Sequence, residues 1–179
     1  MNLATVDWNE VSAIAQIVGS IAVVFSVLYL AIQIHQSTRL AKVTAQDTAA
    51  TALREVTKPF AENSELARIW RVGLEDLTLL STEDQARFFH STYQFLKAFE
   101  TIHFHHASGL MDEQTWQGWC GLLRHYIVSP GIAEYWKLRH DLFSTRFQQF
   151  VATLEPPDDR RTVANLLGRQ NPPPANVSR

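Results

Sequence analysis

The chain has 179 residues, of which 46% are apolar, 11% aromatic and 19% charged, and its formal net charge is -2. This length allows one domain of ordinary size, or a smaller domain with an appendage, and excludes two full-size domains. The 16 basic and 18 acidic residues leave no cationic surplus for a nucleic-acid partner, and the single cysteine excludes an intrachain disulfide and a multi-thiolate metal site.

The first predicted element is a long uncharged segment. The 28 consecutive residues between Glu10 and Arg39 include no Asp, Glu, Lys or Arg. From Val11 to Ile34, 18 of 24 residues are apolar. A helix of that length rises about 36 Å, enough for a hydrocarbon core of about 30 Å. We therefore predict a transmembrane helix over residues 11–34, after a short extracytoplasmic N-terminus of residues 1–10.

Two alternatives fit this segment less well. A cleaved signal peptide has a basic start and a shorter apolar run, whereas residues 1–10 contain no Lys or Arg. A core helix of a globular protein is amphipathic, whereas residues 21–32 are apolar on all sides except for Ser26. The pattern favours a membrane span over both.

The charges that flank the segment predict its orientation. Acidic Asp7 and Glu10 precede it, and the basic residues that follow are Arg39, Lys42, Arg54 and Lys58. Basic flanks stay in the cytoplasm, and an aromatic residue such as Trp8 is typical of a membrane interface, here the outer one. We expect a bacterial inner-membrane protein with its N-terminus outside and everything from His35 onward in the cytoplasm, so the lipid bilayer is its first partner.

Small and polar residues form one stripe along the predicted transmembrane helix. Their spacing of three and four residues places them on one helix face, and small side chains let a second transmembrane helix approach closely. Glutamines can hydrogen-bond across such a contact because lipid offers no partner, although small residues are also common in transmembrane helices by chance. The predicted interface comprises Ser12, Ala15, Gln16, Gly19, Ala22, Ser26 and Gln33.

The cytoplasmic part is predicted to be all-α. Residues 35–58 contain no Gly or Pro and are expected to continue the helix as a stalk that stops before Pro59. The stalk is either solvated or packed lightly through its alanines. Residues 60–154 are predicted to form a compact bundle of about five helices, with start signals at Asn63, a capping box at Ser81 and Asp84, and further starts at Asp112, Ser129-Pro130 and Ser144.

The end of the third predicted helix and the C-terminal tail have their own signals. Gly109 is expected to terminate a long helix that begins at Ser81. Residues 155–179 turn polar and contain three successive prolines, which predicts a largely disordered tail with at most a short helix over residues 161–167.

Aromatic residues are expected to fill the bundle. On the long helix, apolar residues recur at helical spacing and predict a central position. They are Phe88, Phe89, Tyr93, Phe95, Leu96, Phe99, Ile102 and His106. Further aromatics are expected to pack around them, namely Trp70, Trp116, Trp119, Tyr126, Trp136, Phe143, Phe147 and Phe150.

The one metal-like pattern is an E-x-x-H pair formed by Glu100 and His103, which share a helix face. Carboxylate-bridged di-iron bundles need two such pairs, and the chain has no second one. A mononuclear metal site remains an alternative, with Glu100, His103 and a third ligand from His125 or His140. A metal-binding or enzymatic domain would be centred on Glu100, His103 and His106. The opposing interpretation makes Glu100 a structural ion-pair partner of Arg124 or Arg139.

No catalytic constellation emerges elsewhere. Cys120 has His125 nearby in sequence, but an unpaired cysteine in an apolar helix is usually an inert core residue. The Ser-x-x-Lys, Gly-x-Ser-x-Gly, phosphate-loop and H-E-x-x-H patterns are absent. We expect no cofactor and no catalytic residue.

Several blocks of the chain form a common pattern. They are residues 8–11, 15–19, 29–34 and 62–74, then Gly109-Leu110, Trp116, Trp119, residues 129–131 and Trp136. Together they resemble a group of small bacterial single-pass membrane proteins without an assigned biochemical activity. The resemblance covers residues 8–154 and implies an anchor followed by a cytoplasmic helical domain, with no catalytic residue. His35 stands where the group has a basic residue.

The sequence thus favours a membrane-anchored helical module that binds protein, either another copy of itself or another subunit of a membrane complex. The alternative is a metal-binding or enzymatic domain centred on Glu100. An oligomeric pore ranks lower, because the predicted span contains no ionisable ring.

Overall fold

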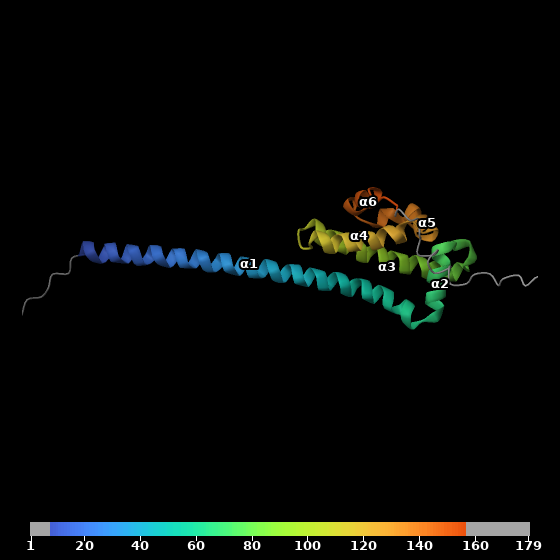
Figure 1. The fold of residues 1–179 in the computed structure, drawn as a ribbon, viewed down its shortest axis with the longest axis horizontal. Coiled ribbons are helices and arrows are strands. Elements are labelled where there is room, and N and C mark those ends of the chain that lie inside the picture. The colour runs from blue at the N-terminus through green and yellow to red at the C-terminus, as the bar shows by residue number, and fades with distance from the viewer. Residues whose placement is uncertain (1–7, 157–179) are drawn as a thin grey trace, which may run out of the picture. The chain divides into compact units, whose positions relative to one another are not determined.

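The computed structural model describes residues 8–156, which are 89% helical and contain no strand. The predicted all-α class is confirmed. The predictions for residues 1–7 and 157–179, including the disordered tail and its short helix, concern residues outside those described. In chain order the elements are α1 (Trp8–Glu62), α2 (Ser64–Glu75), the 3-10 helix η1 (Leu77–Leu79), α3 (Thr82–Ala107), α4 (Glu113–Ile127), α5 (Pro130–Arg139), the 3-10 helix η2 (His140–Leu142) and α6 (Thr145–Ala152) (Figure 1).

The chain divides into two compact units, the first ending at Thr44 and the second beginning at Ala45, and α1 contributes residues to both. In the first unit, the most apolar 18-residue stretch of α1 has no buried side chain. Within the described residues, α1 is the one helix whose length and apolar composition suffice to cross a membrane. The described part of the first unit is therefore an exposed apolar helix without a core of its own.

The expectation that this helix stops before Pro59 is wrong, because α1 continues through Pro59 to Glu62. Proline removes one backbone donor, but the Pro59 carbonyl still accepts a 2.9 Å hydrogen bond from the Asn63 N–H. Phe60 stacks on Trp70 with ring centroids 4.8 Å apart. This aromatic contact stabilises the extra turn of α1, since such pairs contribute about 0.5–1.5 kcal/mol beyond the burial of their apolar area.

The last part of α1 packs within the second unit through its alanines, one of the two possibilities that the sequence left open. Ala49 is fully buried and Ala45 nearly so. Leu53 and Val56 pack partly against the same core, and the Gln46 side chain donates a 2.9 Å hydrogen bond to Asp112.

Local start and stop signals set the later helices. Asn63, Ser81, Asp112 and Ser144 each accept backbone N–H groups of the first turn that follows. Ser129 precedes α5 without a side-chain cap, and Pro130 occupies the first turn. Of the predicted capping box, the bond from the Asp84 N–H to the Ser81 hydroxyl is present at 3.2 Å, and the Asp84 carboxylate accepts from Arg68 at 2.7 Å.

The end of α3 is a Schellman motif built on Gly109. Gly109 has a φ of +72°, the left-handed conformation that glycine adopts without strain. The Leu110 and Gly109 N–H groups donate to the carbonyls of His105 and His106 at 3.0 and 2.9 Å. The predicted terminator is therefore confirmed.

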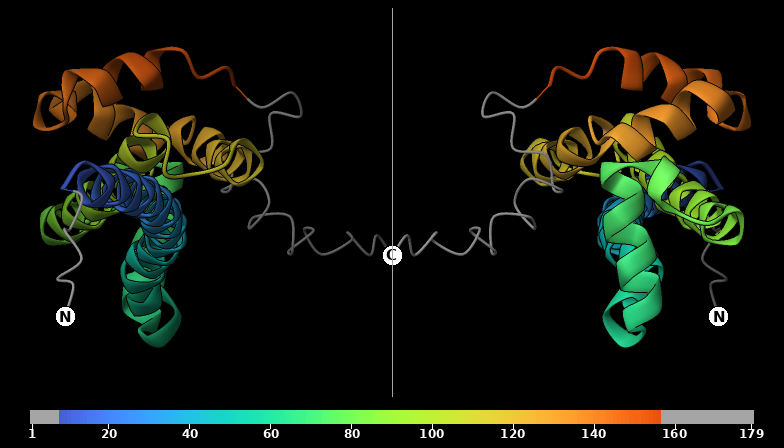
Figure 2. Two further views of the ribbon diagram at one scale, coloured as in Figure 1. Left: turned by 90° about the vertical axis from the view of Figure 1, so that its left-hand side faces the viewer. Right: turned by 90° about the vertical axis from the view of Figure 1, so that its right-hand side faces the viewer.

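Helix α3 occupies the centre of the second unit and contacts α2, α4 and α5. Figure 2 shows α5 and α6, in orange, as a layer over α3 and α4. Tyr93, expected on the core face, is 37% exposed. The expected core aromatics that are buried are Trp70, Phe88, Phe95, Phe99, Trp116, Phe143 and Phe147. The others, Phe89, Trp119, Tyr126, Trp136 and Phe150, are partly buried and pack against this core.

Two glycines let α2 and α5 touch through their backbones. A Cβ atom at Gly131 would overlap the carbonyl oxygen of Gly73 and lie 2.8 Å from its carbon. A Cβ atom at Gly73 would in turn overlap the Phe88 ring. Only glycine fits at these two positions. This close crossing of α2 and α5 was not predicted from the sequence.

Candidate functional site

The residues of the predicted transmembrane interface all lie exposed on α1. They are Ser12, Ala15, Gln16, Gly19, Ala22, Ser26 and Gln33. A Cβ atom at Gly19 would meet nothing within 4 Å, so the stripe has open space around it. The Ser26 hydroxyl donates to the Ala22 carbonyl at 2.8 Å, which leaves this hydroxyl satisfied within its own helix.

Glu100 sits at a junction between α3 and the start of α6, but its partners differ from those expected. The predicted ion pair with Arg124 or Arg139 is wrong. Lys97 lies on the same helix face, and its ammonium donates to Glu100 at 2.6 Å. The Ser144 backbone N–H donates to the other carboxylate oxygen at 2.6 Å. Glu100 therefore ties the N-cap residue of α6 to α3.

These contacts determine the charge state of Glu100. Burial alone would raise the pKa of this carboxyl, but the hydrogen bonds from Lys97 and Ser144 and the positive charge of Lys97 lower it below the ordinary value. Glu100 is therefore a carboxylate at neutral pH. A carboxylate held by an ammonium and a backbone N–H serves structure rather than proton transfer.

His103 and His106 each stack on one aromatic ring. The His103 ring lies 4.6 Å from Phe150 at an interplanar angle of 15°, and His106 lies 4.4 Å from Trp116 at 6°. Burial, followed by the charges of Arg146 and His106, lowers the pKa of His103, and the His106 Nε2 atom lies 3.2 Å from a Glu113 carboxylate oxygen. These imidazoles act as parts of the aromatic packing.

The structure does not assemble the suggested metal ligands. Among residues 8–156, no group of three or more His, Cys, Asp or Glu side chains has an arrangement that could hold a metal ion. Of the two suggested third ligands, His140 contacts the Trp136 carbonyl through Nδ1 at 3.2 Å. The spacing of Glu100 and His103 is thus explained by aromatic packing and one ion pair.

Cys120 lies in the core on α4. It is 4% exposed, and burial raises the pKa of its thiol to about 11. At neutral pH it is a thiol rather than the thiolate that nucleophilic catalysis requires. The interpretation of Cys120 as a core residue accounts for both observations.

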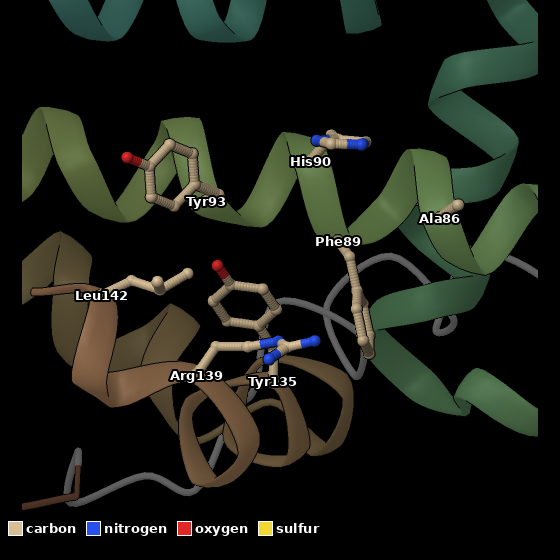
Figure 3. A pocket seen from close by; sticks show the side chains of 7 residues that line it. All are labelled: Ala86, Phe89, His90, Tyr93, Tyr135, Arg139 and Leu142. Carbon is tan, nitrogen blue, oxygen red and sulfur yellow. The ribbon is translucent and has the colours of Figure 1, made fainter.

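A pocket that the sequence analysis missed lies between α3 and the α5–η2 segment, with a cavity volume of about 420 Å³ (Figure 3). It was not predicted because its two sides come from helices that are distant in the sequence. One signal was available, because Phe89 and Tyr93 share one face of α3, and Tyr135 and Arg139 share one face of α5. The lining residues are Ala86, Phe89, His90, Tyr93, Tyr135, Arg139 and Leu142.

A smaller pocket of about 300 Å³ lies beside Glu100, and Thr101, His103, Phe104, Ser144 and Arg146 complete its lining. Its carboxylate is already engaged by Lys97 and Ser144. The larger pocket is the better candidate for a ligand because two phenol side chains, Tyr93 and Tyr135, line it together with Arg139.

Comparisons with family models, with curated proteins and with solved structures find no match for this chain.

Proposed function

We propose that this chain is a membrane-anchored helical interaction module, in which residues 11–34 cross a lipid bilayer once. One observation carries the proposal, namely that the apolar segment of α1 leaves its side chains exposed along its whole length. Burying one large aliphatic side chain is worth about 1.5–3 kcal/mol. A long run of such exposed side chains therefore favours hydrocarbon over water.

Hydrogen bonding within α1 supports the same environment. Polar groups in hydrocarbon need partners inside the protein, and a helix supplies them for its backbone. The hydroxyls of Ser20 and Ser26 donate to the carbonyls of Ile17 and Ala22, each at 2.8 Å. These serines thus enter a bilayer without an unpaired donor.

The flanking charges support an orientation with the N-terminal side outside and the second unit in the cytoplasm. Arg39 and Lys42 follow the segment, and no basic residue precedes it. Retention of basic flanks in the cytoplasm is the main determinant of topology. Trp8, which is 77% exposed, is placed to anchor the outer interface.

The exposed stripe on α1 supports a helix partner in the membrane, either a second copy of this chain or another subunit of a membrane complex. Small residues permit close backbone approach, and Gly19 leaves open space on its side of the helix. An occupant of this space would pack against Gly19 and Ala22.

Replacing Gly19 and Ala22 with leucine is expected to weaken this assembly by about tenfold or more, because overpacking a close contact typically costs about 1–3 kcal/mol. The Gly19→Leu change is not strained within the chain, since its Cβ meets nothing within 4 Å. The measurement is the mass and composition of the particle extracted from native membranes in mild detergent.

The matched control is the double variant Ile21→Leu and Val24→Leu. These two residues lie on the side of α1 opposite Gly19 and Ala22. This control should leave the particle unchanged. For the unchanged chain, a homogeneous homo-oligomer would indicate self-assembly, and stoichiometric foreign subunits would indicate an accessory role. An identical particle in the Gly19 and Ala22 variant would remove the stripe from the proposal.

A further inference from the structure

The pocket between α3 and α5 carries an arginine without a counter-ion. Figure 3 shows Phe89, His90 and Tyr93 on the α3 side and Tyr135 and Arg139 on the α5 side of one hollow. Among residues 8–156, no carboxylate forms an ion pair with the Arg139 guanidinium. Arg68, Arg71 and Arg87 each have one, and Arg39, Arg54, Arg124 and Arg146, like Arg139, have none within this range; of these, only Arg139 lines this pocket. The guanidinium is therefore available to an anion.

The groups around Arg139 combine hydroxyls with aromatic surface. The Tyr135 phenol lies within electrostatic reach of the Arg139 guanidinium and of the Asp141 carboxylate, and Asp141 does not line the pocket. Phe89 packs edge-to-face on Tyr135, with ring centroids 5.3 Å apart and an interplanar angle of 81°. Tyr93 and Leu142 remain partly exposed beside them. The hollow thus offers one guanidinium, two phenols, the His90 imidazole and apolar walls.

We propose that this pocket binds a small monoanionic carboxylate with a flat apolar body. A guanidinium presents two parallel N–H donors that match the two oxygens of a carboxylate. One arginine balances one negative charge, whereas a phosphate dianion would call for further cations. The flat body packs against Phe89 and Tyr135, since aromatic rings favour offset or edge contacts. The volume of about 420 Å³ lies in the range of small-molecule sites.

This site is independent of the membrane anchor, so failure of either proposal leaves the other standing. The test uses the full chain in neutral maltoside micelles and 2-naphthoate as the probe, with empty micelles as the blank. We expect saturable binding with a Kd of about 1 mM or tighter, measured by ligand-observed NMR. The uncharged 2-naphthamide should bind at least about tenfold more weakly.

Two variants locate the site and one serves as a matched control. Arg139→Gln removes the cation from an exposed position and should weaken 2-naphthoate binding by about tenfold or more. Ala86→Phe should block the hollow while keeping the charge. Lys137→Gln removes the other cation of the last turn of α5, which does not line the pocket, and should change the Kd by less than about twofold.

Thermal unfolding of each variant would verify that the fold is intact. The proposal is overturned by an absence of saturable binding up to about 10 mM. It is equally overturned by full binding in Arg139→Gln, or by equal losses in Arg139→Gln and Lys137→Gln, which would mark a diffuse charge effect.

Discussion

Replacing Gly131 with alanine is expected to lower the free energy of unfolding of the helical unit by roughly 3 kcal/mol, the upper end of overpacking effects. The new Cβ would overlap the Gly73 carbonyl oxygen and approach Phe88 Cζ to 3.2 Å. Neither neighbour is the free end of a flexible side chain, since one is backbone and the other a fully buried ring. Relief therefore requires α2 and α5 to separate, which opens the core.

The matched control for this variant is Gly118→Ala on α4. Gly118 is exposed and its Cβ would meet nothing within 4 Å, so the helix propensity of alanine should raise stability by up to about 1 kcal/mol. Urea unfolding of both variants in micelles, followed by tryptophan fluorescence, measures the difference. Gly131→Ala with native stability would contradict the close crossing of α2 and α5.

Replacing Val23 and Val24 with arginine is expected to abolish integration of the chain into membranes. Both valines are more than half exposed and lie at the middle of residues 11–34. Each arginine at the centre of a transmembrane helix costs about 2.5–3.5 kcal/mol. The pair therefore shifts the insertion equilibrium by a factor of more than about 10³. Alkaline extraction followed by flotation measures the fraction that remains in the bilayer.

Leu40→Arg with Val43→Arg provides the matched control, because these residues are equally exposed on the same helix but lie outside residues 11–34. This control should stay membrane-integrated. If the Val23 and Val24 variant also stays integrated, α1 does not span the bilayer there. If both variants are released, the boundaries of the span are wrong.

The starts and ends of the helices could be predicted because their causes are local. Asn63, Ser81 and Asp112 accept hydrogen bonds from N–H groups two or three residues ahead. Gly109 ends α3 through its own backbone conformation. Such signals need no knowledge of distant residues.

The partners of individual side chains could not be predicted in the same way, because they depend on how helices cross. Gly73 and Gly131 meet across 58 positions of the chain. Glu100 binds Lys97 and Ser144 instead of the expected partner, Arg124 or Arg139. Helix α1 continues through Pro59, where Phe60 stacks on Trp70. The rule that a helix ends before a proline takes no account of such a tertiary contact.

The candidate pocket could not be predicted from the sequence for the same reason. Sequence spacing places Phe89 with Tyr93 and Tyr135 with Arg139, yet only the packing of α3 beside α5 makes these pairs face one hollow. The exposed stripe on α1 is the opposite case, because one helix contains all of its residues and the sequence alone defines it.

The most direct test of the membrane-anchored account is cysteine accessibility in intact bacterial cells. In a Cys120→Ser background, one chain carries Asn2→Cys and another carries Thr153→Cys, an exposed position just after α6. A membrane-impermeant maleimide should label the cysteine at position 2 in intact cells and the cysteine at position 153 only after lysis. Equal labelling of both positions in intact cells, or of neither before lysis, would contradict a single crossing by α1.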